Sequence, residues 1–271
     1  DAEALAEWIA HYPTLPVKSP RRVLIVMAGN IPFVGLFDLL CVVMSGNIPV
    51  IKSSSKDSHL MGWVVEMLHD IEPKLQVESF ANQSVDAVIA TGSESAFRHF
   101  KSQYAGSHSL LRGDRHSVAV LSGKEGQAEL EALSQDIFLY SGLGCRNVSM
   151  IFAPQGMEIC LTPPKMNPLY IDNYRHTKAL LTMLGQKFID LNSALLVESD
   201  EFTPALSAIA LCRYGDIAEV ERWIEEHDAE LQCVVSMCVS HSRLVDFGQA
   251  QSPGLFDYAD DVDTMRFLAS I

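Results

Sequence analysis

Short apolar runs and longer amphipathic segments alternate along this chain. Residues 21–30, RRVLIVMAGN, form a β-branched run of the kind that is buried on both faces of a parallel sheet. Residues 33–47, FVGLFDLLCVVMSGN, have helical length and an apolar face, with SGN as a stop signal, and IPVIKSSS at 48–55 begins a second strand. These three segments predict a βαβ unit.

The same alternation continues to about residue 154. It predicts a helix at 57–71 with Asp57 or Ser58 as N-cap, a strand at 85–93 that ends in a glycine turn, and a helix at 94–104. A strand at 116–123, a helix at 126–140 and a strand at 147–154 follow. The pattern predicts an α/β fold with mainly parallel sheets, whose ligands gather at the carboxyl ends of the strands.

The last third of the chain repeats the scheme after a Pro- and Asn-rich stretch at 158–185, which predicts a loop and then a helix from about Asn173. The final helix lies within 260–271, with Asp260 or Asp261 as its N-cap. We expect a nucleotide-binding domain over residues 1–115, a catalytic domain over 116–240 and a returning segment over 241–271.

Composition narrows the classes of function. The 271 residues are 48% hydrophobic, which suits a globular protein with one large core or two coupled ones, and the formal net charge of -14 disfavours a nucleic-acid partner. Pro32, Asp38, Gly46 and Asn47 interrupt the apolar stretch at 31–51, so we expect no membrane span. The six cysteines form no CxxC pair and lack His-rich spacing, which predicts free thiols in a reducing cytoplasm and no metal site.

Four short motifs fall where this architecture would place a functional site, and three of them directly follow a predicted strand. Each alone is typical of an ordinary turn or a solvated loop, and their co-location is the functional signal. The motifs are Gly29-Asn30, Lys52-Ser53-Ser54, Thr91-Gly92-Ser93 and Cys145.

Two of these motifs suggest a nucleotide site. Thr91-Gly92-Ser93 opens a helix, so its backbone N–H groups and hydroxyls suit a pyrophosphate, although it is not a GxGxxG fingerprint. An NAD-preferring βαβ unit carries an acid near the end of its second strand, whereas this chain has Lys52, Ser54 and further Ser and Lys residues there. Cations and hydroxyls suit a 2′-phosphate, which favours NADPH; a solvated loop is the alternative.

Cys145 is the candidate nucleophile. It follows flexible glycines and precedes Arg146, an arrangement that suits an accessible thiolate. A packed cysteine before a strand is the alternative. The remaining five cysteines lie in apolar runs or, for Cys160, lack a supporting base, so we interpret them as structural.

The motifs resemble, in order, those of the aldehyde dehydrogenase superfamily, and more narrowly those of the acyl-CoA reductase family. The best-known members of that family are the fatty-acid reductase components of bacterial luminescence systems. The resemblance covers most of the chain from Pro20 onward, except residues 154–184. Members of the family are usually longer at the N-terminus than this chain, so we expect part of the nucleotide domain to be missing. It is carried by AGNIPFVGLFDLLCVVMSGNIPVIKSSSKD, DAVIATGS, YSGLGCRNVS and FGQAQSPGLFDYADDVDTMRFL.

The resemblance implies an aldehyde dehydrogenase-like fold, with a Rossmann-type nucleotide domain and an α/β catalytic domain, and a reaction in which Cys145 takes the acyl group from acyl-CoA or another acyl thioester and NADPH reduces it to the aldehyde. The Asn30 amide and the backbone N–H of Cys145 would form an oxyanion hole, worth about 3 kcal/mol per donor. The implied cofactor residues are Lys52 and Ser54 for the adenosine ribose or its phosphate, Thr91, Gly92 and Ser93 near the pyrophosphate, and Asp200 for the nicotinamide ribose.

Two departures from the superfamily pattern bear on this reading. DEFTP at 200–204 has Thr203 in place of a glycine, and a slip of one residue would choose Glu201 instead of Asp200. LLRGDRHSVAV at 110–120 has leucine where hydrolytic members carry the glutamate that activates water, which favours reduction over hydrolysis. A small slip in that alignment would make Asp114 a candidate base.

Two other functions remain open: an NAD(P)-dependent dehydrogenase that oxidises aldehydes, and a nucleotide-binding subunit without catalysis. By analogy with the superfamily and the luminescence systems, we expect a homo-oligomer and, as possible partners, subunits that transfer acyl groups.

Overall fold

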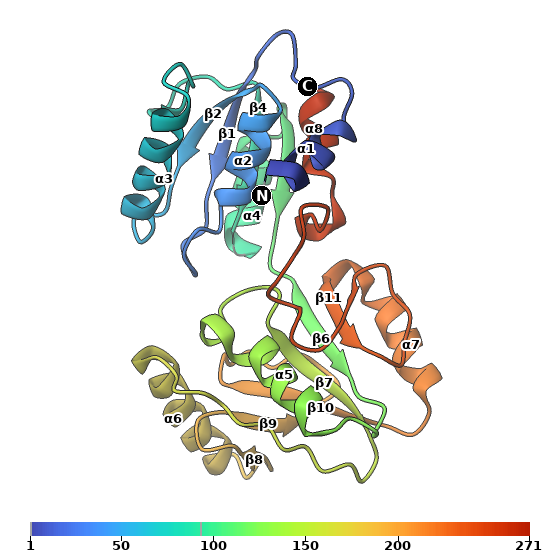
Figure 1. The fold of residues 1–271 in the computed structure, drawn as a ribbon. Helices are drawn as coiled ribbons and strands as arrows, with labels where there is room; N and C mark the ends of the chain where they lie inside the picture. Colours follow the sequence, from blue (N-terminus) through green and yellow to red (C-terminus); the bar gives the residue numbers. More distant parts are fainter. Residues whose placement is uncertain (1, 93) are drawn as a thin grey trace. The chain divides into compact units, whose positions relative to one another are not determined.

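The computed structural model describes residues 2–92 and 94–271, and the chain divides into two compact units (Figure 1). Unit 1 comprises Asp1–Asp114 and Gly254–Ile271, and unit 2 comprises Arg115–Pro253. Residues 241–253, which the sequence analysis grouped with the returning segment, therefore pack in unit 2. The nucleotide-binding and catalytic roles of the two units stay predictions at this point.

Unit 1 is built on a parallel sheet in the order β3-β2-β1-β4-β5. The chain leaves β1 toward β2 and β3, and then returns to add β4 and β5 on the other side, which is the strand order of a Rossmann-type half. The strands are β1 (Arg22–Val26), β2 (Ile48–Lys52), β3 (Glu78–Ser79), β4 (Ala87–Thr91) and β5 (His108–Arg112).

Helices cover both faces of this sheet because the β1 side chains alternate between two apolar clusters. Val23 and Ile25 pack with residues of α1, α2, α3 and α8, whereas Leu24 and Val26 pack with Phe100 of α4. The helices of unit 1 are α1 (Ala2–Ala10), α2 (Leu36–Met44), α3 (Ser58–Ile71), α4 (Glu94–Gln103), the 3-10 turn η3 (Ala259–Asp261) and α8 (Thr264–Ala269).

A buried ion pair joins three elements of unit 1. The Arg112 guanidinium at the end of β5 donates to both carboxylate oxygens of Asp38 on α2, at 2.8 and 2.7 Å, and to Thr264 Oγ1 at the start of α8, at 2.8 Å. Burial alone would lower the pKa of Arg112, but the adjacent Asp38 carboxylate raises it, and the net shift is upward. The Arg112 guanidinium therefore stays charged, and its bonds to Asp38 and Thr264 hold α2 and the C-terminal helix on the unit.

Unit 2 contains a larger sheet in the order β12-β11-β6-β7-β10-β9-β8, and every pairing in its described strands is parallel except β8 with β9. Its strands are β6 (His116–Val120), β7 (Val148–Pro154), β8 (Ile189–Asp190), β9 (Leu195–Glu198), β10 (Ala208–Tyr214), β11 (Leu231–Ser236) and β12 (Leu244–Val245). Its helices are α5 (Gln127–Phe138), η1 (Leu139–Gly142), α6 (Pro168–Met183), α7 (Ile217–Glu226) and η2 (Asp228–Glu230).

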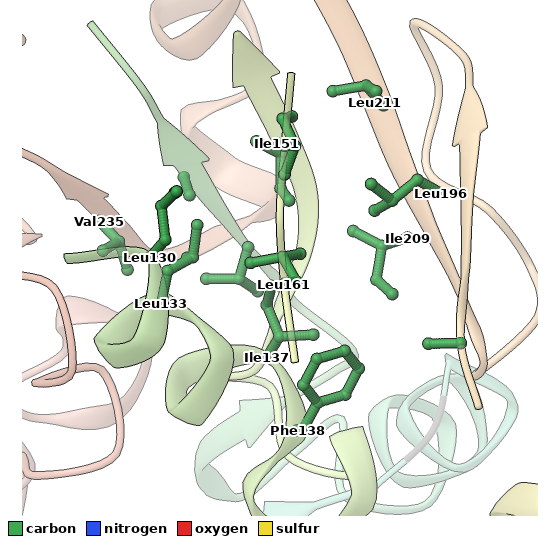
Figure 2. Packing of buried hydrophobic residues seen from close by; sticks show 14 of the residues in the cluster. Leu130, Leu133, Ile137, Phe138, Ile151, Leu161, Leu196, Ile209, Leu211 and Val235 are labelled. Carbon is green, nitrogen blue, oxygen red and sulfur yellow. The ribbon is translucent and has the colours of Figure 1, made fainter. Parts of the chain in front are cut away.

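The main core of unit 2 lies under α5. Figure 2 shows Leu133, Ile137 and Phe138 of this helix directed at Ile151 and Ile209 of the sheet. On the opposite face, residues of β6, β7 and β10 pack against α7. The two units confirm the predicted α/β class with mainly parallel sheets.

Several local predictions were wrong in detail. Helix α6 begins at Pro168, earlier than the predicted start near Asn173. Asn167 is its N-cap and accepts a hydrogen bond from the Tyr170 N–H at 2.8 Å, and Pro168 occupies the first turn. The final helix is capped by Asp263, which accepts from Arg266 N at 2.9 Å, rather than by Asp260 or Asp261.

None of the described helices is long and apolar enough to cross a bilayer.

Replacing Arg112 with Met should destabilise unit 1 by about 3–5 kcal/mol, because it leaves the Asp38 carboxylate buried without its cation. Denaturant unfolding followed by circular dichroism would measure this. The control is Arg266→Ala on α8, which removes an exposed partner of Asp263 and should cost less than about 0.5 kcal/mol. Equal losses in the two variants would contradict a structural role for the buried pair.

Candidate functional site

The carboxyl ends of β1 and β2 lie in direct contact. Met27 N donates to the Lys52 carbonyl at 3.0 Å, just beyond the paired residues Val26 and Lys52. At the next turn, a Cβ placed on Gly29 would overlap the Ser54 side chain. Only glycine fits at position 29, because the backbone of the loop after β1 lies directly against the Ser54 side chain in the loop after β2.

The loop that carries Asn30 is fixed by Asp57. This residue occupies the predicted N-cap position of α3, but its buried carboxylate accepts the N–H of Phe33 at 3.0 Å instead of capping the helix. Phe33 has a φ of 61°, in the left-handed region. Asn30 itself is exposed in the loop between β1 and this anchor.

Cations and hydroxyls gather at the end of β2, as the sequence indicates. Lys52 is exposed, with its Nζ 5.4 Å from the centre of the Phe80 ring, and Lys56 is exposed four residues later. Ser54 is half-buried, and its Oγ accepts from Lys56 N at 3.3 Å. The residues present fit a ligand that carries a phosphate or ribose hydroxyls.

Thr91 is the last residue of β4, which pairs with β1, and Gly92 follows it. Gly92 N donates to the Arg112 carbonyl at 3.2 Å, and a Cβ on Gly92 would lie 2.8 Å from Ala96 Cβ, so the turn sits close against α4. Ser93 lies outside the described residues. Because β1, β2 and β4 are parallel neighbours, the structure brings Asn30, Lys52, Ser54, Thr91 and Gly92 to one edge of the unit 1 sheet.

Cys145 lies in a closed turn that enters β7. Asn147 N donates to the Gly144 carbonyl at 3.0 Å, and Asn147 Oδ1 accepts from Gly144 N at 2.8 Å. The Cys145 carbonyl accepts from Ser117 Oγ at 2.9 Å. The turn therefore lies at the amino end of β7 and not at a carboxyl end, where the general rule for α/β sheets would put a ligand.

Asn147 has a second task that the sequence analysis missed. Its buried amide Nδ2 donates to the carbonyls of Asp136 and Ile137, each at 3.1 Å, and of Leu139 at 2.9 Å. These carbonyls end α5, so one side chain closes both the helix and the nucleophile turn. The signal in the sequence is an asparagine two residues after the cysteine.

None of the six cysteines, all of which lie in the described part of the chain, forms a disulfide, and Cys145 and Cys160 are the two exposed ones. Burial raises the pKa of the thiols of Cys41, Cys212 and Cys233, which makes them poor nucleophiles at neutral pH. Within residues 2–92 and 94–271, no three His, Cys, Asp or Glu side chains are arranged to hold a metal ion.

The DEFTP segment connects β9 to β10, and its two acids, Asp200 and Glu201, are both exposed. Phe202 stacks on the ring of His116, with centroids 4.0 Å apart and planes at 15°. His116 and Ser117 are adjacent at the start of β6, so the segment and the Cys145 turn are anchored on neighbouring residues. Asp200 contributes, after burial, to the raised pKa of Cys212 on β10, which places this acid near that strand.

The segment that was aligned with the hydrolytic glutamate forms β5 and the residues after it. Leu110 is buried in the core of unit 1, Arg112 is paired with Asp38, and Asp114 is exposed just beyond the strand. The predicted pairing of Asn30 with Cys145 joins different units and stays a prediction.

The sequence pattern that defines the acyl-CoA reductase (LuxC) family matches residues 3–162, more than half of the chain. No curated protein sequence matches the chain.

Solved structures share the fold at low identity. An aldehyde dehydrogenase of Mycobacterium tuberculosis complexed with NAD+ has a TM-score of 0.64 and 12% identity over 81% of this chain. An oxidoreductase from Marinobacter aquaeolei has a TM-score of 0.67 and 13% identity, and the match covers 93% of this chain and 69% of that one. An NAD-dependent aldehyde dehydrogenase from Sinorhizobium meliloti has a TM-score of 0.60 and 10% identity, over 81% of this chain and 55% of that one. For the Mycobacterium tuberculosis aldehyde dehydrogenase, the match covers 57% of that chain, so this protein spans a little over half of its length.

Replacing Gly29 with Ala should destabilise unit 1 by about 1–3 kcal/mol, because the new methyl group overlaps Ser54. Ser54→Gly in the same chain should restore most of the loss, since it removes the overlapping atoms. Thermal unfolding of the two single variants and the double variant measures the coupling. Additive losses would show that the two loops do not pack as described.

Proposed function

The chain belongs to the acyl-CoA reductase (LuxC) family, and we propose on that basis that it reduces an acyl-CoA or another acyl thioester to the aldehyde. The observation that supports the proposal most directly is the Cys145 turn, where an exposed thiol sits on a backbone held by Ser117 and Asn147. A held backbone keeps the nucleophile in one geometry at the moment of attack.

In the proposed first step, the Cys145 thiolate attacks the thioester carbonyl carbon. A new C–S bond forms, the bond to the CoA sulfur breaks, and CoA leaves as the thiolate. The side-chain amide of Asn30 and the N–H of Cys145 are the proposed donors to the carbonyl oxygen, which carries the negative charge in the tetrahedral intermediate.

In the second step the acyl group on Cys145 becomes the aldehyde. NADPH, when bound, supplies the hydride. Hydride addition to the carbonyl carbon would give the thiohemiacetal anion on Cys145, whose collapse would break the C–S bond and release the aldehyde and the Cys145 thiolate. Asn30 again stabilises the charged oxygen, and the free thiolate is ready for the next turnover.

We assign the cofactor to the edge of the unit 1 sheet. Lys52 and Ser54 are the proposed partners of the adenosine ribose and its 2′-phosphate, Thr91, Gly92 and Ser93 of the pyrophosphate, and Asp200 of the nicotinamide ribose. The fold supports a nicotinamide cofactor, since the similar Mycobacterium tuberculosis enzyme was solved with NAD+. Preference for NADPH rests on the exposed cations Lys52 and Lys56.

Oxidation of aldehydes is the second candidate, because the fold is shared with aldehyde dehydrogenases. It requires a base that activates water. The aligned segment has leucine where hydrolytic aldehyde dehydrogenases carry this base, and Leu110 is buried in the core of unit 1, so we favour reduction. Asp114, exposed just beyond β5, is the carboxylate that the oxidative function would have to use. We further propose a cytoplasmic homo-oligomer that receives acyl groups as thioesters, free or from a partner subunit.

Mixing the protein with acyl-CoAs of several chain lengths should add one acyl group to Cys145, detected by intact-protein mass spectrometry. NADPH should then discharge the adduct as aldehyde, because the carbonyl carbon of the acyl-Cys145 thioester is the electrophile that accepts the hydride. Cys145→Ser should block aldehyde formation, and Cys160→Ser, which removes the other exposed thiol, should leave it unchanged.

Acid instead of aldehyde as the product would favour the aldehyde-oxidising function. Tight NADPH binding without any adduct would favour a nucleotide-binding subunit and refute the covalent mechanism.

Lys52→Ala should weaken NADPH binding about tenfold and change NADH binding by less than about twofold, because only the former carries the 2′-phosphate. Titration of cofactor fluorescence measures both constants. Lys74→Ala, which removes an exposed lysine after α3, is the matched control. Equal weakening of the two cofactors by Lys52→Ala would refute the assignment of Lys52 to the phosphate.

A further inference from the structure

A segment far along the chain, residues 246–251, is fastened to the helix that precedes the nucleophile turn. The Asp136 carboxylate near the end of α5 accepts from Gly248 N at 2.6 Å and from Ala250 N at 2.9 Å. Asp136 and Ala250 are both completely buried. The reaction proposed above gives Asp136 no role, although a fully buried carboxylate is rare in a protein interior.

The carbonyl of Ala250 is bonded to a residue of the turn that carries Cys145. Arg146, the neighbour of Cys145, donates from Nε to the Ala250 carbonyl at 2.5 Å. The peptide groups of Ala250 therefore bridge an anion on α5 and a cation beside the nucleophile. The sequence suggested that Arg146 supports the thiolate, whereas its Nε is engaged with the main chain of this segment.

Glycine makes the close approach possible. Gly248 has a φ of 81°, and a Cβ on it would lie 3.1 Å from Ala132 Cβ on α5. Burial raises the pKa of Asp136 to about 6, although the two N–H groups and then Arg146 lower it. Each of the two carboxylate oxygens of Asp136 accepts one of these N–H groups.

We propose that Asp136 is a positioning residue for Cys145. By holding Gly248 and Ala250, it fixes the carbonyl to which Arg146 is bonded, and Arg146 in turn fixes the turn of Gly144 to Asn147. The segment 246–251 thereby becomes part of the support of the nucleophile. This inference deepens the proposed acyl transfer and rests on it for its catalytic consequence, while its structural part stands on the contacts alone.

The test compares wild type with Asp136→Asn, which keeps the shape and replaces one acceptor oxygen by a donor that faces an N–H group. Hydrogen–deuterium exchange should rise at least tenfold in both 246–251 and 143–148. The single-turnover rate constant for acylation by acyl-CoA should fall on the order of 10- to 100-fold, with the half-saturating concentration little changed, since the nucleophile moves and the binding surface does not.

Arg146→Met provides the second variant, because it removes Nε, keeps an apolar stem and leaves Asp136 in place. It should loosen 143–148 and slow acylation as Asp136→Asn does, and the double variant should be no worse than either single one, because both act through Ala250. If Asp136→Asn does not fold, Arg146→Met decides the outcome. The control is Asp190→Asn, whose carboxylate bonds to Tyr174 and Lys178.

Three results would overturn the proposal: unchanged exchange in 143–148 while 246–251 loosens, acylation at the wild-type rate in either variant, or additive losses in the double variant. A wild type that never acylates would refute the proposed function instead. Exchange in 143–148 would then still decide whether Asp136 positions the turn.

Discussion

Buried backbone groups at the end of α5 and in residues 246–251 must find hydrogen-bond partners, and the region around Cys145 depends on the two side chains that provide them. Asn147 takes three carbonyls at the end of the helix, and Asp136 takes two N–H groups of the segment. An unpaired buried group would cost about 1–3 kcal/mol, so neither side chain can be lost without rearrangement. Asn147 and Arg146, the residues that follow Cys145, connect its turn to these buried hydrogen bonds.

At the carboxyl edge of the unit 1 sheet, the loops are held mainly by close packing of glycines against neighbouring side chains. Gly29 lies against Ser54, and Gly92 lies against Ala96, so the loops after β1, β2 and β4 are held without long side chains. Asp57 then fixes the loop of Asn30 from the start of α3. Glycine at 29 and 92 permits this packing, because a Cβ there would overlap the side chain of Ser54 or of Ala96.

The apolar pattern predicted the fold well because each strand of a parallel sheet is buried on both faces and stands out as a continuous run. It also located Cys145 in a turn and Lys52 and Ser54 at a strand end, because glycines and hydroxyls interrupt those runs. Asp136 on α5, Ser117 on β6 and Asn147 in the turn before β7 escaped prediction, since the sequence gives no sign that a single polar residue is buried. Some of their partners are main-chain groups far along the sequence, 114 residues away for Asp136 and Ala250 and 116 residues away for Ser117 and Cys233.

Asp57 and the last helix show the other limit. An aspartate before a helix predicts a cap, yet the Asp57 carboxylate bonds to a loop 24 residues earlier, and Asp263 rather than Asp260 or Asp261 starts α8. Side-chain caps compete with tertiary partners of similar energy, so local sequence cannot choose between them.

Unit 1 draws on both ends of the chain, with unit 2 inserted as one continuous stretch. Trp8 donates to Tyr258 at 2.7 Å, Asn47 to the Leu268 carbonyl at 3.3 Å and Arg112 to Thr264 at 2.8 Å, so early strands are completed by late residues. On the ribosome, all the strands of unit 1 emerge before the helix that closes its core, and residues 115–253 are synthesised in between. The inserted unit can therefore finish folding first, and the first unit must wait, with part of its apolar surface uncovered, until translation reaches Thr264.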